Sequence, residues 1–162
     1  MTSLLCTADR VFDGQALVRG AAVRVTGPAL SAVGEAALLA GNDASERHDF
    51  HGCTILPGLI DTHVHLVFSA LDTHEAVVEQ VVRETDEQLL ARALANARAA
   101  LHSGITTVRD CGGKGRITQE VRERIRRGEA AGAEVLSCGM PITTSTGHCH
   151  WLGLTADTHA EA

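Results

Sequence analysis

The residues with the clearest chemical potential are one aspartate and two histidines, Asp61, His63 and His65, spaced two positions apart. In an extended segment every second side chain projects from the same face, so all three would point the same way. Two neutral imidazoles on one face can bind a divalent metal, and a nearby carboxylate can orient one of the rings. An H-x-H pair also arises by chance without binding anything, so the spacing alone leaves both interpretations open.

Other nucleophilic or metal-binding residues are scattered along the chain. The five cysteines, Cys6, Cys53, Cys111, Cys138 and Cys149, are odd in number and contain no C-x-x-C pair. This usage is typical of reduced thiols and predicts a cytoplasmic protein without a disulfide framework or a structural zinc site. Nine histidines invite a metal-storage function, but most of them lack ligand spacing, which disfavours it.

Length and composition are typical of a soluble globular protein. The 162 residues suffice for one domain, or for a small domain and part of a larger one. A net charge of −6 disfavours nucleic acids and anionic membranes as partners. The first twenty residues lack the basic and apolar regions of a secretory signal. No apolar stretch approaches the ~20 residues that span a bilayer, so no membrane partner is expected.

The first fifty residues show short β-type runs separated by turn residues. The expected strands are residues 4–7, 22–25 and 30–33, and one helical turn is expected at residues 36–40. Asp13-Gly14 and Gly27-Pro28 are typical turn sequences. This pattern predicts a small antiparallel β-layer.

From Thr54 onward the pattern alternates between strands and helices. The expected strands are residues 54–56, 105–109 and 133–137, and the expected helices are residues 75–83, 86–102 and 118–127. The longest helix has a capping box of Thr85 with Gln88 at its start and Gly104 just past its end. Strand, helix, strand, helix, strand is the signature of a parallel α/β unit.

Four segments of the chain carry a resemblance to a known family. In chain order they are Ala8–Gly14, Ile55–Leu66, Ser103–Gly113 and Pro141–Trp151. The second of them, ILPGLIDTHVHL, closely resembles the first barrel strand of the amidohydrolase superfamily. The others resemble that family's small β-domain, its second barrel strand and the segment after its third strand, in the same order. The last segment is most similar to the imidazolonepropionase-like and Xaa-Pro or Xaa-Arg dipeptidase-like branch.

The resemblance implies an α/β fold in two parts. Residues 1–53 would form a small β-sandwich-type domain of the amidohydrolase type. Residues 54–162 would form the first three or so β/α units of a TIM (β/α)8 barrel. Because such a barrel typically needs ~250 residues, it would be incomplete in this chain.

The resemblance also implies a metal site and a reaction. The family's histidines that match His63 and His65 bind the first of one or two divalent metals, most often zinc. The metal activates a water molecule, which then hydrolyses a C–N bond of an amide, a peptide or a cyclic amide. Asp61 is expected to orient one of the two rings from the second coordination sphere.

His148 matches a histidine that lines the family's substrate pocket, and it is expected to bind substrate. Two glycines commonly precede that histidine, whereas here Thr146 and Gly147 do, and a threonine restricts the backbone. Cys149 and His150 could imitate a metal-binding pair, but we expect them to be exposed loop residues.

The rest of the family's site is missing from this sequence. A catalytic zinc needs about three protein ligands, and the family takes a carboxylated lysine or a glutamate, two histidines and an aspartate from later strands. Lys114 is the only lysine and comes too early in the chain for that role. Arg109 and Asp110 end the second barrel strand, where a capping or salt-bridging role and a substrate role are both open. No catalytic residue is therefore assigned within this chain.

The sequence supports two hypotheses about function. In the first, the chain is the front part of a metal-dependent hydrolase of small-molecule amides or dipeptides, completed by a missing C-terminal segment or by a partner chain. In the second, it is a non-catalytic truncated fragment with at most a weak metal site. An open three-stranded sheet would expose apolar surface and unpaired strand edges, which also favours self-association.

Overall fold

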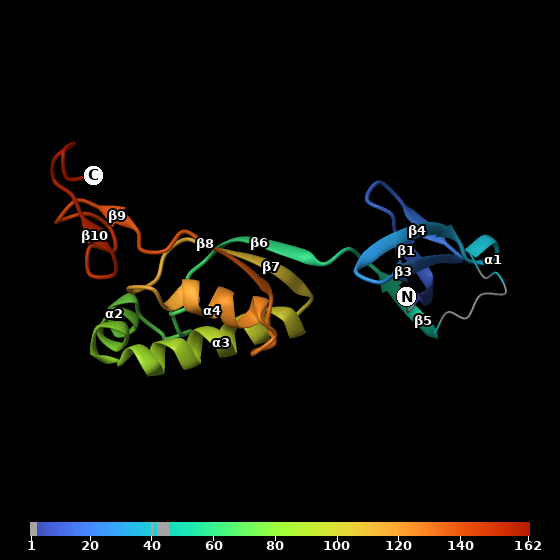
Figure 1. Cartoon of the computed structure of the whole chain (residues 1–162), viewed down its shortest axis with the longest axis horizontal. Helices are drawn as coiled ribbons and strands as arrows, with labels where there is room; N and C mark the ends of the chain where they lie inside the picture. Colours follow the sequence, from blue (N-terminus) through green and yellow to red (C-terminus); the bar gives the residue numbers. More distant parts are fainter. Residues whose placement is uncertain (1–2, 40, 42–45) are drawn as a thin grey trace. The chain divides into compact units, whose positions relative to one another are not determined.

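The computed structural model describes residues 3–39, 41 and 46–162, and the chain divides into two compact units between Pro57 and Gly58 (Figure 1). The sequence places this boundary after Cys53 instead. The difference arises because Thr54 and Ile55 complete the last strand of the first unit and do not open the second. Each unit is described by itself.

The first unit is built on one five-stranded sheet. Its strands are β1 (Ser3–Phe12), β2 (Leu17–Arg19), β3 (Ala21–Thr26), β4 (Ala29–Glu35) and β5 (Glu46–Ile55), and a helical turn, α1 (Ala36–Leu39), follows β4. Strands β2, β1, β3 and β4 pair in that order and antiparallel, whereas β5 pairs with β1 in parallel. The antiparallel pairing of β1 to β4 agrees with the expected layer, whereas the parallel strand β5 was not expected and makes the described sheet mixed. The sandwich-type arrangement stays a prediction.

Strand β1 shows why the strand predicted from the sequence pattern is shorter than the observed one. Leu5, Ala8 and Val11 are its buried residues, three positions apart instead of two. The register between β1 and β5 shifts between Ala8 and Arg10, and such a bulge interrupts the alternation that marks a strand in sequence. The expected strand at residues 4–7 is therefore only the first part of β1.

The second unit is an α/β unit with a three-stranded parallel sheet, as the sequence predicts. Its strands β6 (Leu59–Val64), β7 (Ile105–Asp110) and β8 (Glu134–Ser137) lie side by side in that order. The helices are α2 (His74–Arg83), α3 (Asp86–His102) and α4 (Ile117–Arg126). Two short strands, β9 (Ile142–Thr143) and β10 (Leu154–Thr155), form a separate parallel pair near the end of the chain. Figure 1 shows α3 and α4 next to each other on one face of the main sheet.

Helix α3 has the predicted bounds because its end signals are local. The Thr85 hydroxyl oxygen accepts the Gln88 N–H, and the Gln88 side-chain oxygen accepts the Thr85 N–H, which completes the capping box. Gly104 follows with a φ of +85°, where a side chain would be strained. Ala93 and Ala97 are fully buried in the core between the helices and the sheet.

None of the helices in the described part of the chain combines the length and hydrophobicity needed to cross a membrane.

The two faces of the parallel sheet differ in exposure. Val108 and Val135 are register partners on β7 and β8, and both are buried beneath the helices. The next pair, Arg109 and Leu136, points the other way and is exposed, with 51% of Leu136 accessible. One face of this sheet is thus covered by α3 and α4, and the other is open.

Candidate metal centre

The two histidines of the H-x-H pair lie at the carboxyl end of β6. His63 is in the strand and exposed, and His65 follows the strand and is half-buried. Their ring centroids are 5.4 Å apart, with 72° between the ring planes. The structure thus brings together the two side chains that the sequence predicts as metal ligands.

The imidazole of His65 is held by a main-chain carbonyl. Its Nδ1 atom lies 2.8 Å from the carbonyl oxygen of Gly112. Because a carbonyl oxygen only accepts hydrogen bonds, Nδ1 carries a proton, and in the neutral ring Nε2 then keeps a free lone pair. A backbone carbonyl on the far nitrogen is a common device for orienting a histidine toward a metal.

Gly112 occupies a position that suits only glycine. Its φ is +143°, and a Cβ atom there would lie 2.8 Å from Cδ of Pro141. The Asp110 carboxylate accepts the Gly112 N–H at 3.1 Å and the Leu66 N–H at 2.8 Å. Asp110 therefore ties the loop that supplies the carbonyl to the residue directly after His65.

Asp110 is fully buried, and burial raises the pKa of its carboxyl group. The two backbone N–H groups and the nearby His65 act in the opposite direction but do not outweigh the desolvation. The hydrogen bonds that Asp110 accepts from Leu66 and Gly112 thus brace two loops. Arg109, its neighbour, donates to the carbonyl oxygen of Thr62 at 3.4 Å.

Two further polar residues from the sequence analysis contact the main chain. The Asp61 carboxylate accepts the backbone N–H of His63 at 3.1 Å. A contact of Asp61 with an imidazole ring stays a prediction. The ammonium group of Lys114 donates to the carbonyl oxygen of Glu84 at 3.4 Å.

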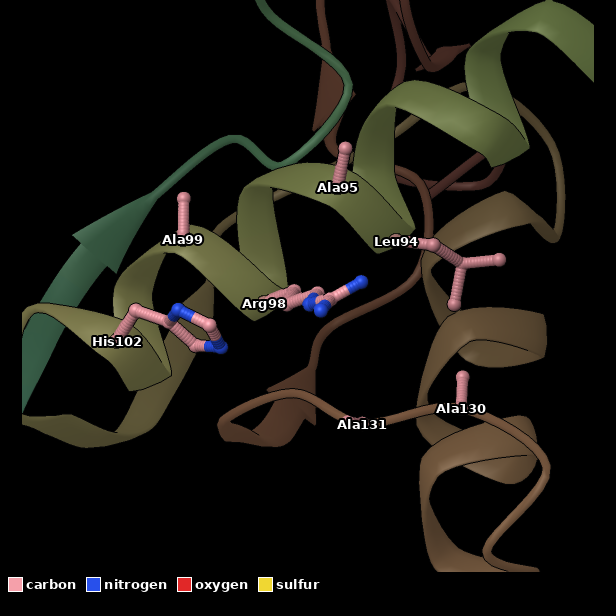
Figure 2. A pocket seen from close by; sticks show the side chains of 7 residues that line it. All are labelled: Leu94, Ala95, Arg98, Ala99, His102, Ala130 and Ala131. Atoms are coloured by element: carbon pink, nitrogen blue, oxygen red, sulfur yellow. The ribbon is translucent and has the colours of Figure 1, made fainter.

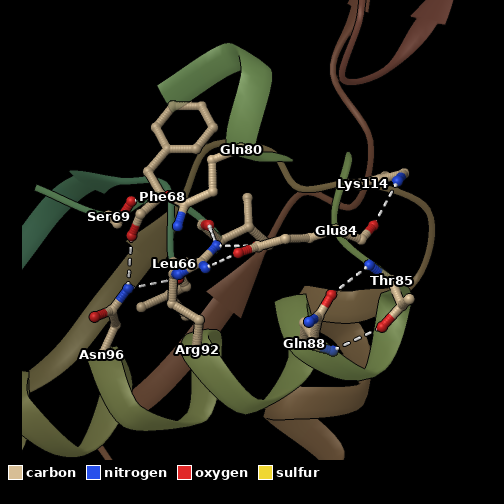
Figure 3. A network of polar contacts seen from close by, with 11 residues as sticks. Leu66, Phe68, Ser69, Gln80, Glu84, Thr85, Gln88, Arg92, Asn96 and Lys114 are labelled. Carbon is tan, nitrogen blue, oxygen red and sulfur yellow. Dashed lines mark hydrogen bonds and ion pairs between the residues drawn. The ribbon is translucent and has the colours of Figure 1, made fainter. Parts of the chain in front are cut away.

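Helix α3 holds the segment that follows the histidine pair (Figure 3). The amide group of Asn96 donates to the carbonyl oxygens of Leu66 and Phe68, both at 2.8 Å. Arg92, one turn earlier, donates to the carbonyl oxygen of Val67 at 3.3 Å. Three successive carbonyls are therefore fixed by two side chains of one helix.

A chain of ring contacts connects the histidine pair with His148. Phe68 stacks on His65 with centroids 4.7 Å apart, and Trp151 stacks on Phe68 at 5.8 Å. His74 lies 6.5 Å from Trp151 and 6.4 Å from His148. The sequence pattern assigns no role in the site to His74, Phe68 or Trp151. No spacing rule connects them, because they come from three separate segments.

The segment around His148 differs from the sequence expectation at one residue. His150 is exposed, as expected, but Cys149 is buried in the core of the second unit. His148 is exposed, and its substrate-binding role stays a prediction. Cys149 has a φ of 57° and is the only non-glycine with positive φ among the described residues. Thr146 therefore does not need the left-handed conformation. Gly147 makes a close turn, since a Cβ there would lie 2.1 Å from a threonine hydroxyl.

The histidine pair supplies two ligands of a metal site and not a complete one. Within the described ranges, no group of three or more histidine, cysteine, aspartate and glutamate side chains could hold a metal ion. A catalytic zinc takes about three protein ligands. The two residues present fit a metal in chemical type, because imidazole is a zinc ligand and the free Nε2 of His65 is available.

A separate surface cavity of about 530 Å³ lies on the helical side of the second unit (Figure 2). It is lined by Leu94, Ala95, Arg98, Ala99, His102, Ala130 and Ala131. The lining combines small alanine side chains with two basic ones and does not include the histidine pair. We assign no function to this cavity.

The fold and the histidine pair define a class of protein. The sequence profile of the amidohydrolase family matches residues 54–161, which include both histidines, and the chain belongs to this family. The match covers the whole parallel sheet and all the ring contacts described above.

The sequence relatives include imidazolonepropionases. The protein of Anaeromyxobacter sp. (strain K) is 32% identical over 162 aligned positions, covering 82% of this chain and 38% of that protein. The protein of Caulobacter vibrioides (strain NA1000 / CB15N) is 29% identical over 157 positions, covering 84% of this chain and 39% of that protein. The chain therefore spans about two fifths of the length of these relatives.

Solved structures of the family resemble the chain in fold. A Xaa-Pro dipeptidase with methionine bound in its active site has a TM-score of 0.77 and 26% identity, covering 91% of this chain and 36% of that chain. An amidohydrolase has a TM-score of 0.78 and 25% identity, covering 99% of this chain and 42% of that chain. These comparisons support a hydrolase of the amidohydrolase type.

Proposed function

We propose that this chain forms the first part of a metal-dependent amidohydrolase that hydrolyses C–N bonds. The observation that carries the proposal is the geometry of the H-x-H pair at the carboxyl end of β6. The Gly112 carbonyl fixes Nδ1 of His65, which leaves Nε2 free beside the ring of His63. Membership of the amidohydrolase family supports the hydrolytic chemistry.

The proposed metal is a divalent ion, and zinc is the first candidate because imidazole nitrogen is one of its preferred ligands. When bound, the ion would activate a water molecule and polarise the carbonyl group of the substrate. His63 and His65 would hold it. Asp110 would keep the supporting loops in place, and Asp61 would steady the main chain of His63.

The proposed architecture is the start of a TIM (β/α)8 barrel, completed by a segment outside this sequence. The parallel sheet of the second unit has three strands and one open face, and the family match covers a minor part of each relative's length. The remaining metal ligands would come from a C-terminal part of the same polypeptide or from a partner chain. This chain alone is then expected to lack activity.

The proposed substrate is a small molecule with an amide, peptide or cyclic amide bond, acted on in the cytoplasm. The names of the relatives favour the imidazolonepropionase-like and dipeptidase-like branch. His148 is the proposed substrate-binding residue. Ring contacts through His74, Trp151 and Phe68 connect it with the metal histidines.

A second candidate is a non-catalytic fragment with a weak metal site. The observation that favours it is the ligand count, because no third ligand joins His63 and His65 within the described residues. Two ligands alone bind a divalent metal weakly and do not prepare it for catalysis.

A native mass spectrum of the protein isolated from its own cells separates the two candidates. The hydrolase proposal predicts a species heavier than 17.0 kDa, through additional polypeptide and a metal-sized increment. That species should hydrolyse N-acyl amino acids, dipeptides or cyclic amides, and the 17.0 kDa chain with added zinc should not. Metal-free 17.0 kDa chains or their self-aggregates would favour the fragment, and robust turnover by the chain alone would contradict the need for completion.

A further inference from the structure

Two cysteines lie next to each other at the carboxyl ends of β7 and β8. The last register partners of these strands are Asp110 and Ser137, and Cys111 and Cys138 follow them directly. The Cys138 N–H donates to the Asp110 carbonyl oxygen at 3.1 Å, and further on the Gly113 N–H donates to the Gly139 carbonyl oxygen at 3.0 Å. These two bonds bracket both cysteines, so the two main chains remain side by side through them.

If the alternation of the two strands continues past Asp110 and Ser137, both thiols lie on the open face of the sheet. Arg109 and Leu136 are exposed register partners, and Cys111 and Cys138 each follow two residues later. Side chains two positions apart on a strand project from the same face. Asp110, which lies between Arg109 and Cys111 in the chain, is buried on the opposite, helix-covered face. By the same alternation the cysteines would project together from two main-chain segments that the hydrogen bonds above keep side by side, and the usual spacing of neighbouring strands is about 4.8 Å.

We propose that Cys111 and Cys138 form a dithiol site that binds one thiophilic metal or metalloid centre through both sulfur atoms. Both residues are free thiols. Two thiolates on one tetrahedral centre, each with a bond of about 2.3 Å, lie about 3.8 Å apart. Side chains on adjacent strands reach this separation by rotation about χ1. Soft ligands of this kind select soft, thiophilic ions.

The surroundings of the two sulfur atoms leave them able to bind. The Cys111 thiol donates weakly to the carbonyl oxygens of Thr62 and Arg109, at 3.9 and 3.7 Å, and the Cys138 thiol donates to its neighbour Gly139 at 3.9 Å. All three partners are acceptors, so the sulfur lone pairs stay free. Burial raises the pKa of Cys138, with Asp110 and Cys111 adding to the effect. Binding must therefore release the thiol protons. Strongly thiophilic centres displace these protons most readily.

This site is separate from the histidine pair, although the two lie close. Thr62, whose carbonyl oxygen is 3.9 Å from the Cys111 sulfur, directly precedes His63. Since the dithiol site uses neither histidine, its test does not depend on the proposed hydrolytic function.

Phenylarsine oxide is a suitable probe, because it reacts with two thiols at once. Two arsenic–sulfur bonds form, and the arsenic-bound oxygen leaves as water with the two thiol protons. Arsenic stays trivalent, so nothing is oxidised or reduced. The full chain with Cys6, Cys53 and Cys149 changed to serine keeps only the proposed pair. Intact-mass measurement should show one phenylarsenic group per chain. It should persist in excess 2-mercaptoethanol and leave with 2,3-dimercaptopropanol.

Cys111→Ser and Cys138→Ser in this background are the matched controls. Each variant retains a single thiol and can form only one arsenic–sulfur bond. An added monothiol should therefore release the arsenical at least about tenfold faster from either variant than from the protein with both cysteines, where the second bond is intramolecular. Equal release from the pair and from either single-thiol variant would overturn the proposal. The same comparison in the otherwise unchanged chain guards against a triple variant that does not fold, and the fluorescence of Trp151 reports folding of the second unit.

Discussion

At the residue scale, the orientation of His65 depends on the glycine whose carbonyl oxygen holds Nδ1. We predict that Gly112→Ala destabilises the second unit by about 1–3 kcal/mol, because its φ of +143° is strained for any side chain. The displaced carbonyl would also weaken zinc binding by about 10–100-fold. Urea unfolding followed by Trp151 fluorescence and a zinc titration measure the two effects.

Gly115→Ala is the matched control for this prediction. Gly115 lies in the same loop with a φ of +57°, but a Cβ there would meet open space. It therefore bears a backbone cost without the clash at Pro141 or the displaced carbonyl. Equal loss of zinc affinity in both variants would mean that the Gly112 carbonyl does not orient His65.

A second prediction at the residue scale concerns pH and Asp110. Burial raises the pKa of Asp110 above its ordinary value of 3.8, so the folded chain binds this proton more tightly than the unfolded chain. As pH rises from 3.8 through the raised pKa, the stabilisation from this group is lost. The unfolding free energy of the wild type should therefore fall relative to that of Asp110→Asn, which does not titrate.

Unfolding of both proteins across a pH series, with Trp151 fluorescence as the signal, measures this difference. Subtracting the variant removes the contributions of the other titrating groups. A difference that stays constant, or grows as pH rises through this window, would show that the pKa of Asp110 is not raised in the folded state.

The residue scale also shows how far a motif can predict a site. The spacing of His63 and His65 is enough to predict the metal pair as a hypothesis, because alternation along a strand is a local rule. Gly112 is 47 residues away from His65 in sequence. Because the contact is made by a main-chain carbonyl, which every residue has, no residue type in the sequence indicates it. The supporting contacts therefore could not be predicted without the fold.

At the scale of elements, α3 acts as the clamp on the segment that follows the histidines. Asn96 alone fixes the carbonyl oxygens of Leu66 and Phe68. We predict that Asn96→Ala destabilises the second unit by about 1–3 kcal/mol, because both carbonyls lose their donor. Looser packing of Phe68 should also change the emission of Trp151, which stacks on it.

Arg98→Ala is the control on the same helix, since Arg98 is exposed and lies beside the cavity on the helical side. It should leave stability within about 0.5 kcal/mol of the wild type and the emission unchanged. Equal effects of the two substitutions would mean that the Asn96 bonds do not hold this segment.

Element boundaries were predictable where the signals are local. The capping box at Thr85 and the glycine at position 104 predict Asp86–His102, and these bounds are confirmed. Strand β5 shows the opposite case. It runs from Glu46 to Ile55 and depends on parallel pairing with β1, which no short pattern records. The expected strand at residues 54–56 therefore proved to be the end of a first-unit strand.

At the scale of the whole molecule, the uncovered face of the parallel sheet should govern association. Leu136 is 51% exposed on this face although it belongs to a strand. We predict that Leu136→Ser lowers self-association of the isolated chain, because exposed apolar patches drive it. Light scattering across a concentration series measures the effect. Leu101→Ser, at a 36% exposed leucine on α3, is the control, and an equal decrease there would argue against a special role for the open face.

The most direct test of the central claim is a zinc titration of the full chain in a Cys111→Ser, Cys138→Ser background, which removes the proposed dithiol site. We predict one weakly bound zinc, with the affinity lowered at least about tenfold in His63→Ala and in His65→Ala. His102→Ala, at an exposed histidine of α3, should bind like the parent. Equal affinity in all three variants, or no binding by a folded parent, would contradict the assignment of His63 and His65 as metal ligands.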